Sequence, residues 1–290
     1  MKALRALLGN AIDYAGLFPP ATLDMGKAVE NYSSYCEGEY SWMLGRFIVP
    51  VPRLDEFKQH TAGLLPPPGN EPWKISALCR PEDLGMVERF NEQHNGTARI
   101  DVLEIKGSDA DSITRNALAA RSFSTYFEIP VDSDPHALLT TIKLVGGRAK
   151  VRAGGISENL FPKSADLIRF MKACSSLGVP FKATAGLHHP IRARYPLTYD
   201  ATSQKGMMYG FLNLLFAASF ISTGLPSEEA LDILNEQDPR EFRIEEEGIA
   251  WKKRRLTVGE IASARQNAAI SFGSCSFIEP VDELKKLGFM

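Results

Sequence analysis

Short runs rich in β-forming residues alternate with segments of helical spacing along most of this 290-residue chain. Strands are expected at Ala11–Phe18, Leu44–Val51, Lys74–Cys79, Ile100–Lys106, Thr125–Val131, Ala149–Ala153 and Phe181–Ala185. Helices are expected between them at Met25–Glu37, Pro81–Gln93, Asp109–Ala120, Pro135–Val145 and Lys163–Leu177. Repeated strand-then-helix units predict a parallel sheet. Their number favours a closed (β/α)8 barrel of the TIM type over an open sheet, which would be expected to carry a glycine-rich nucleotide motif that this chain lacks.

The C-terminal third departs from this alternation. Further helices are expected at Thr198–Ile221, Glu228–Asn235 and Pro280–Leu287. We interpret Arg243–Leu256 as a hairpin that turns at Gly248, with its acidic arm facing its basic arm. Ile270–Phe277 is the preferred eighth strand, and Phe242–Ile249 is the alternative. The prediction is a single barrel domain over residues 1–290, with an excursion at about 225–265 before the last strand.

The composition excludes several function classes. A formal net charge of −2 gives no reason to expect a nucleic acid or an acidic membrane as partner. The 4 cysteines form no CxxC pair, which argues against a zinc site or disulfide framework and favours a reduced, cytoplasmic location. The N-terminal residues lack the long apolar region of a signal peptide. The excursion offers a contact element for a homo-oligomer.

The phase of the strands separates apolar from charged positions. Alternate side chains of a strand point to opposite faces, so in a barrel one parity faces the helices and the other faces the interior. The apolar parity must pack under the helices. The charged parity must then face inward, and it contains Arg46, Glu104, Lys106, Glu128, Lys150, Arg152 and Lys182.

This inward set carries an excess of positive charge. Burying unpaired charge is costly, so such a cluster must be wet, internally paired or occupied by an anion. We therefore expect a site for a small carboxylate or phosphate at the C-terminal mouth of the barrel. Structural pairing of Glu104 with Lys150, or of Glu128 with Lys182, is the alternative interpretation.

Two segments concentrate the expected chemistry: Ala-Lys-Val-Arg-Ala-Gly-Gly at 149–155 and Phe-Lys-Ala-Thr-Ala-Gly-Leu-His-His-Pro at 181–190. Each places a lysine in a buried strand shortly before small residues and glycine. A lysine among cations has a lowered pKa, so its neutral amine can attack a carbonyl. The turns that follow the two strands lie next to Arg152 and offer backbone N–H groups to an anion. The expected anion-binding positions there are Gly154, Gly155, Thr184 and Gly186.

The two lysine segments resemble the paired lysine strands of class I, Schiff-base aldolases of the deoxyribose-phosphate type. The order of the two segments differs from that family, and His188-His189-Pro190 has no counterpart in it. The resemblance implies a barrel enzyme in which Lys182 or Lys150 forms a Schiff base. No family resemblance extends over the whole chain.

Residues near the ends of the last strands offer further candidates. His188 shares the parity of Lys182 and could serve as a general acid or base. Ser274 and Ser276 share one face, and hydroxyl groups at a helix start suit an anion. Cys275 is interpreted as buried and inert rather than nucleophilic. No metal-ligand spacing is evident, and the only metal set considered combines His188 with Glu104 or Glu128.

Three functions remain open from the sequence. The first is a lyase or isomerase acting on a small anionic carbonyl or sugar-derived compound, with Lys182, Lys150, Glu128, Glu104 and His188 as candidate catalytic residues and no cofactor. The second is an enzyme that uses a divalent metal held by His188 with Glu104 or Glu128. The third is a non-enzymatic protein that binds a small molecule and whose inward charges are structural.

Overall fold

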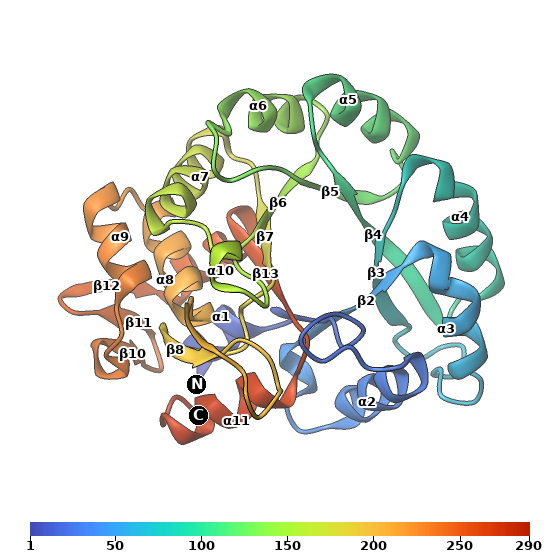
Figure 1. The fold of residues 1–290 in the computed structure, drawn as a ribbon, viewed down its shortest axis with the longest axis horizontal. Helices are drawn as coiled ribbons and strands as arrows, with labels where there is room; N and C mark the ends of the chain where they lie inside the picture. The colour runs from blue at the N-terminus through green and yellow to red at the C-terminus, as the bar shows by residue number, and fades with distance from the viewer.

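The structure, a computed structural model, describes residues 1–290. Parallel strands close into a barrel in the order β1-β13-β7-β6-β5-β4-β3-β2, with helices around its outside (Figure 1). The barrel strands are β1 Ile12–Tyr14, β2 Leu44–Pro50, β3 Trp73–Leu78, β4 Ala98–Lys106, β5 Ser124–Glu128, β6 Arg148–Arg152, β7 Phe181–Thr184 and β13 Ala269–Ser274. The expected (β/α)8 barrel is confirmed.

The last strand of the barrel is β13, in the preferred range 270–277. It pairs with β7 on one side and with β1 on the other, with Phe272 opposite Ile12. The alternative, Phe242–Ile249, is wrong, because those residues belong to a separate small sheet. A buried strand is needed between β7 and β1, and nearly all of β13 is buried.

Helices follow the barrel strands and also form the chain ends. They are α1 Lys2–Leu8, α2 Met25–Glu37, α3 Leu54–His60, α4 Leu84–Gln93, α5 Ala110–Ala119, α6 His136–Leu144, α7 Ser164–Leu177, α8 Phe211–Ser222, α9 Ser227–Asn235, α10 Val258–Asn267 and α11 Ile278–Lys286. Short 3-10 turns lie at Ser41–Met43, Val51–Arg53, Pro81–Asp83, Glu158–Leu160 and Pro239–Glu241. None of the helices combines the length and the apolar character that crossing a membrane requires.

The apolar parity of the strands packs under the helices, as expected. Phe181 of β7 meets Phe170 of α7 edge to face, with 5.3 Å between the ring centroids. Both rings belong to a continuous core of 73 buried residues. Burial of this apolar surface is the main favourable term in folding, and it forces the opposite parity of each strand toward the barrel interior.

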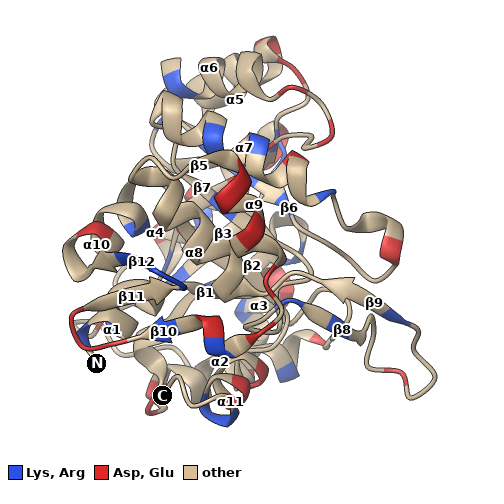
Figure 2. Cartoon of the chain, turned by 90° about the vertical axis from the view of Figure 1, so that its left-hand side faces the viewer, with Lys and Arg blue, Asp and Glu red and all other residues tan.

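The expected long helix over 198–221 is wrong in its first half. Residues Ala193–Pro196 (β8) and Lys205–Met208 (β9) form an antiparallel hairpin that projects from the barrel (Figure 2), and α8 begins only at Phe211. The Asp200 carboxylate accepts hydrogen bonds from the backbone N–H and the hydroxyl of Thr202 and so stabilises the turn. Such local side-chain bonds compete with a helix. The apolar second half forms α8, whose residues 211–221 are all buried.

The expected hairpin over 243–256 is a three-stranded sheet. Its strands are β10 Phe242–Ile244, β11 Gly248–Trp251 and β12 Arg254–Thr257. The chain therefore turns twice, and Gly248 starts the middle strand rather than the turn. The expected pairing of acidic and basic arms is present, since Arg255 lies 2.7 Å from Glu245.

A bulge in β4 changes the charge balance of the interior. Ile75 and Ser76 of β3 are opposite Ile100 and Val102, so the register skips Asp101. An extra residue in one strand re-aims the local side chains. The Asp101 carboxylate thereby receives two hydrogen bonds from the Arg46 guanidinium, each 2.7 Å long.

Candidate functional site

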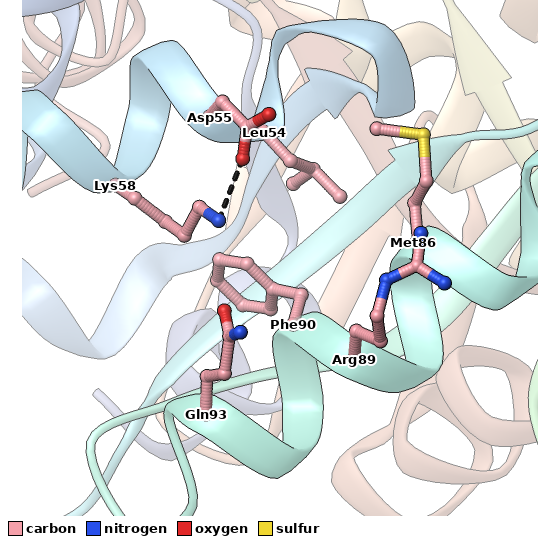
Figure 3. Close-up of a pocket in the computed structure, with 7 residues that line it drawn as sticks. All are labelled: Leu54, Asp55, Lys58, Met86, Arg89, Phe90 and Gln93. Carbon is pink, nitrogen blue, oxygen red and sulfur yellow. Dashed lines mark ion pairs between the residues drawn. The ribbon is translucent and has the colours of Figure 1, made fainter.

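A cavity of about 810 Å³ opens at the ends of the barrel strands where the sequence placed the site. Lys106, Glu128, Lys150 and Arg152 line it together with loop residues that follow the strands. A second, much smaller cavity of about 110 Å³ lies between α3 and α4, where Asp55 and Lys58 form an ion pair (Figure 3). The second cavity is smaller than the roughly 300 Å³ at which ligand pockets begin, so the candidate site is the barrel mouth.

The strand register brings the charged groups of the mouth next to one another. Lys106 of β4 is opposite Glu128 of β5, Glu128 is opposite Lys150 of β6, and Lys150 is opposite Lys182 of β7. Residues paired across neighbouring strands point to the same side of the sheet, so these side chains all face the barrel interior. Glu104, two residues before Lys106, shares its parity and completes the group.

An alternating chain of charges crosses the barrel interior. The Lys182 ammonium lies 2.6 Å from the Asp13 carboxylate and 2.7 Å from that of Glu104. The Lys150 ammonium lies 2.8 Å from Glu104 and 2.6 Å from Glu128. Each lysine therefore sits between two carboxylates. Asp13 is not among the inward charges expected from the sequence, and its carboxylate adds a negative charge, so the predicted cationic excess is wrong for this inner cluster.

Further hydrogen bonds hold the two most buried carboxylates, Asp13 and Glu104, in place. Ser271 donates to Asp13 over 2.8 Å, and Ser76 donates to Glu104 over 2.7 Å. The backbone N–H of Arg46 donates to the other oxygen of Asp13. The Lys182 Nζ also lies 5.5 Å from the ring centre of Tyr126. These partners satisfy the buried groups, and such networks fix side-chain positions.

The neighbouring carboxylates of Asp13, Glu104 and Glu128 determine the protonation state of both lysines. Burial by itself lowers the pKa of Lys182, but Asp13 and Glu104 outweigh it and raise that pKa above its ordinary value. Burial likewise opposes the charge of Lys150, and Glu104 and Glu128 raise its pKa. Burial favours the neutral form of Glu104, but the two ammonium groups hold its pKa well below the usual range. The expected lowering of the lysine pKa is therefore wrong, because the neighbours of both lysines are anions.

The two lysines differ in their access to the cavity. Lys182 is 1% exposed and does not line the cavity. Lys150 lines it together with Glu128, whose side chain is 29% exposed. An ammonium has three N–H donors, and Glu104 and Glu128 occupy two of those of Lys150. One donor remains for a molecule in the cavity.

Two cations of the mouth have no carboxylate within 4.0 Å. They are Lys106 and Arg152, and both line the cavity. The Arg152 Nε donates to the backbone oxygen of Gly154 over 3.2 Å, which leaves its terminal nitrogens free. Arg46, also predicted at the mouth, lies away from the cavity in its pair with Asp101. Lys106 and Arg152 are therefore the groups best placed to bind an anion.

The glycines at the ends of β6 and β7 divide into two roles. Gly155, Thr184 and Gly186 line the cavity, as expected. Gly154 does not, because it packs against Phe161, and a Cβ added to it would lie 2.4 Å from that ring. Gly186 has a φ of 70° and lies close to Gly154. Gly154 thus permits a close approach between two loops rather than contact with a ligand.

His188 lines the cavity but lies on a different side from the expected metal partners. Its Nδ1 lies 3.3 Å from the Ser274 Oγ and 3.4 Å from the Cys275 Sγ. Burial, with a smaller effect of His189, lowers the pKa of His188 to about 3, so its ring is neutral near pH 7. Burial also raises the pKa of the Cys275 thiol to about 11, which agrees with an inert thiol.

Two of the predicted groupings near the last strand are absent. The structure does not bring His188 together with Glu104 and Glu128 as a donor set for a metal. Ser274 and Ser276 do not line the cavity. Instead, the Ser276 Oγ accepts a hydrogen bond from the backbone N–H of Glu279 at the start of α11. The serines thus order the loop after β13.

Sequence reasoning missed the residues that complete the inner network. Asp13 lies in β1, which spans only Ile12–Tyr14 and is too short for a convincing alternation of apolar and polar residues. Ser76 and Ser271 are uncharged, and nothing in the sequence singles them out as partners of the buried charges. The one indication in the sequence that Asp13 faces the interior is its place between the apolar residues Ile12 and Tyr14.

Two comparisons with known proteins, by family model and by curated sequence, identify no relative. No protein-family model matches the chain, and no curated protein sequence matches it. The resemblance to Schiff-base aldolases is therefore supported only in the barrel that it implies. This fold is often that of an enzyme with its site at the C-terminal mouth, and any more specific function has to be argued from the site.

Proposed function

We propose that this protein is a lyase or isomerase that acts on a small carbonyl compound with a carboxylate or phosphate group. The observation that carries the proposal is the ion pair of Lys150 and Glu128, 2.6 Å apart on the wall of the cavity. The same cavity exposes the unpaired cations Lys106 and Arg152. An acid and a base beside an anion-binding pair are the groups that proton transfer next to a carbonyl requires.

Binding begins with the anionic group of the substrate. The guanidinium of Arg152 is planar and suits two oxygens of a carboxylate or phosphate, and Lys106 adds a second positive charge. No carboxylate of the protein has to be displaced from either cation. This arrangement explains why two cations without partners face a cavity while every other cation of the mouth is paired.

The reaction uses Lys150 as a hydrogen-bond donor. Its raised pKa keeps the ammonium charged, so its third N–H donates to the carbonyl oxygen of the substrate. Glu128 accepts the proton from the carbon next to the carbonyl. The C–H bond breaks, its electron pair moves to form an enolate, and the negative oxygen is held by Lys150. Where that carbon also carries a hydroxyl group, the O–H proton passes to the enolate oxygen and the carbon-bound proton returns to the former carbonyl carbon, which completes an isomerisation. Where the next carbon carries a leaving group, the enolate re-forms the carbonyl and a C=C bond, and the group departs with the electron pair of its bond, which completes an elimination.

A Schiff base on Lys150 is the second candidate. The specific observation in its favour is that Glu128 Oε2 lies 2.6 Å from the Lys150 Nζ and can accept the proton that leaves the amine. The neutral amine then attacks the carbonyl carbon, and loss of water gives the imine. Lys182 is not proposed for this role, because it is 1% exposed and does not line the cavity.

The cavity also has an apolar wall, which bears on the substrate. Phe18, Ile48, Leu78, Ile156 and Leu160 line it. Prolines supply further rigid apolar surface at Pro19, Pro20, Pro50, Pro52 and Pro81. A densely hydroxylated sugar would leave its hydroxyl groups unpaired against this wall. The wall therefore favours a carbonyl anion with an aliphatic part.

The experiment follows proton exchange in heavy water. Pyruvate, 4-methyl-2-oxopentanoate and dihydroxyacetone phosphate are incubated with the protein, and loss of the signal from the hydrogens next to the carbonyl is followed by NMR. Enzyme-dependent exchange of at least one probe, abolished in Glu128→Gln, supports proton transfer. Borohydride is added in parallel, and mass spectrometry locates any adduct.

The outcomes separate the candidates. Exchange without a borohydride adduct supports the ammonium role of Lys150, and an adduct on Lys150 supports the Schiff base instead. Binding of a probe, seen by calorimetry, without exchange or adduct argues for a binding protein and against both reactions. The same exchange rate in Glu128→Gln as in the unmodified protein contradicts the role given to Glu128.

A further inference from the structure

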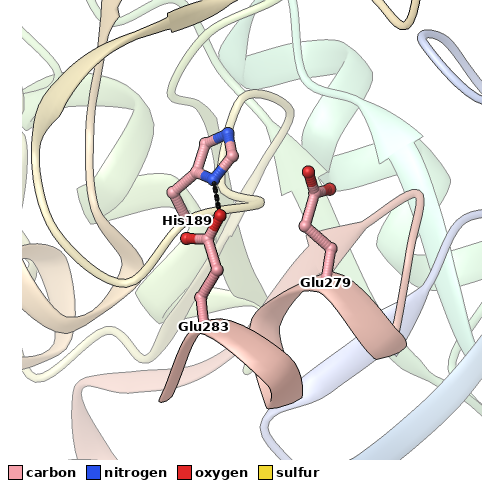
Figure 4. Close-up of side chains that lie close together, drawn as sticks. All are labelled: His189, Glu279 and Glu283. Atoms are coloured by element: carbon pink, nitrogen blue, oxygen red, sulfur yellow. Dashed lines mark hydrogen bonds and ion pairs between the residues drawn. The ribbon is translucent and has the colours of Figure 1, made fainter. Parts of the chain in front are cut away.

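We infer that His189, Glu279 and Glu283 form a site for a divalent transition-metal ion, such as Zn²⁺ or Mn²⁺, beside the barrel mouth. One ligand atom from each of the three side chains lies within 4.8 Å of the other two (Figure 4). The set combines one imidazole nitrogen with carboxylate oxygens, which are donors that both ions accept. None of the three residues lines the cavity of the proposed reaction, and the inference does not depend on that reaction.

The ligands come from two elements that the fold brings together. Glu279 and Glu283 are one helical turn apart on α11, and Figure 4 shows both carboxylates on the side that faces His189. His189 lies in the segment between β7 and α8 and is 7% exposed. Its ring stacks on Tyr195 with 3.5 Å between the ring centroids. The imidazole is therefore held in place before any ion binds.

The charges around the cluster favour a cation. The buried carboxylates of Asp13, Asp83 and Glu104 each have a lysine or arginine within 4.0 Å. Glu279 and Glu283 have none, although both side chains are partly buried. Glu283 pairs only with the His189 Nδ1, at 2.8 Å, and Glu279 only accepts a hydrogen bond from Tyr199. Two neighbouring carboxylates with one histidine leave negative charge that a divalent ion would balance.

One further side chain, Tyr199, contacts the cluster. The Tyr199 hydroxyl lies 2.9 Å from the Glu279 Oε2 and 3.4 Å from the Cys275 Sγ. Hydrogen bonds of this kind orient metal-ligating carboxylates. An ion held here would tie the segment between β7 and α8 to α11. Metal binding should therefore also raise the thermal stability of the protein, because the ion binds only the folded chain at this site.

The test measures metal binding directly on the full-length protein. The protein is treated with a chelator, dialysed, and titrated with ZnCl₂ by calorimetry and with MnCl₂ by electron paramagnetic resonance. We expect one ion per chain and an increase in Tm. Glu279→Gln and Glu283→Gln should each weaken binding by at least about tenfold, since each removes a ligand. Circular dichroism establishes that the variants are folded.

The control uses a pair of carboxylates with the same spacing and no histidine. Glu228 and Asp232 are exposed and one turn apart on α9, so Glu228→Gln with Asp232→Asn should leave binding unchanged. Absence of binding to the unmodified protein would overturn the inference. The same loss in the α9 variant as in the α11 variants would also overturn it, because it would indicate general attraction to acidic surface.

Discussion

Replacing Glu104 by glutamine should destabilise the protein strongly. The carboxylate accepts from Lys182 at 2.7 Å, from Lys150 at 2.8 Å and from Ser76 at 2.7 Å, and its side chain is 1% exposed. Glutamine keeps the size and one accepting oxygen but removes the charge that both ammonium groups face. Breaking a buried pair costs about 3–5 kcal/mol. Each lysine keeps one carboxylate, so we expect about 3 kcal/mol.

The assay is chemical unfolding at pH 7, with thermal unfolding as a second measure. At roughly 2–4 °C per kcal/mol for a large domain, the loss corresponds to a fall in Tm of about 6–12 °C. Glu128→Gln is the matched control, because it removes one pair with Lys150 at a half-buried position and should cost about 1 kcal/mol. If Glu104→Gln were as stable as the unmodified protein, the assignment of Glu104 as the central charge would be refuted.

The pH dependence gives a second check on the same residue. The pKa of Glu104 is lower in the folded than in the unfolded chain, so the unfolded chain binds more protons in acid. Its stabilising contribution is complete above the unfolded value of about 4.3 and is lost as the pH falls toward the folded value. The free energy of unfolding of Glu104→Gln should therefore fall less steeply below about pH 4.3. An unchanged slope would contradict this reasoning.

Three further predictions concern the mouth and its loops. Arg152→Ala and Lys106→Ala should each weaken binding of a carboxylate or phosphate probe by about tenfold or more, as measured by calorimetry. The Tm should change little, because neither cation has an ion-pair partner to lose. Unchanged affinity would show that these two residues do not bind the anion. The ring signals of His188 should show no titration between pH 5 and 8 in NMR, because its pKa is about 3. Its contribution to the free energy of unfolding should fall as the pH drops below about 6.5, because the unfolded chain then binds a proton that the folded chain does not. Gly154→Ala should destabilise the protein, since an added Cβ has no room, whereas Gly259→Ala in α10 should be neutral or stabilise it by about 0.5–1 kcal/mol; equal effects in thermal unfolding would argue against the close loop contact.

Much of the barrel could be predicted because local pattern and tertiary structure agree there. Strand β6 was expected at 149–153 and spans Arg148–Arg152, and α2 has the predicted bounds of Met25–Glu37. Apolar periodicity determines such elements, because each must bury one face. The segment 198–208 was mispredicted for the opposite reason. Within this segment the Asp200 side chain accepts a hydrogen bond from the backbone N–H of Thr202 and stabilises a turn. A turn has no periodic pattern of apolar residues from which it could be predicted.

By itself, the sequence determined the order of the elements and the side of each strand that faces the interior. Alternation along a strand is a local property, so Lys150, Lys182 and Glu104 could be placed inside the barrel from the residues alone. Only the tertiary structure decided which charges meet. Closure of the barrel brings Asp13 from the first strand against Lys182 from the seventh, 169 residues later in the chain.

The contact with Asp13 helps to raise the pKa of Lys182, whereas the sequence led us to expect a lowered pKa. Whether a buried ammonium has a raised or a lowered pKa depends on the charges within a few ångströms, and these come from strands distant in sequence. The bulge at Asp101 similarly removes Arg46 from the set of free cations. The pairings leave Lys106 and Arg152 as the cations open to a ligand and Lys150 as the lysine that reaches the cavity.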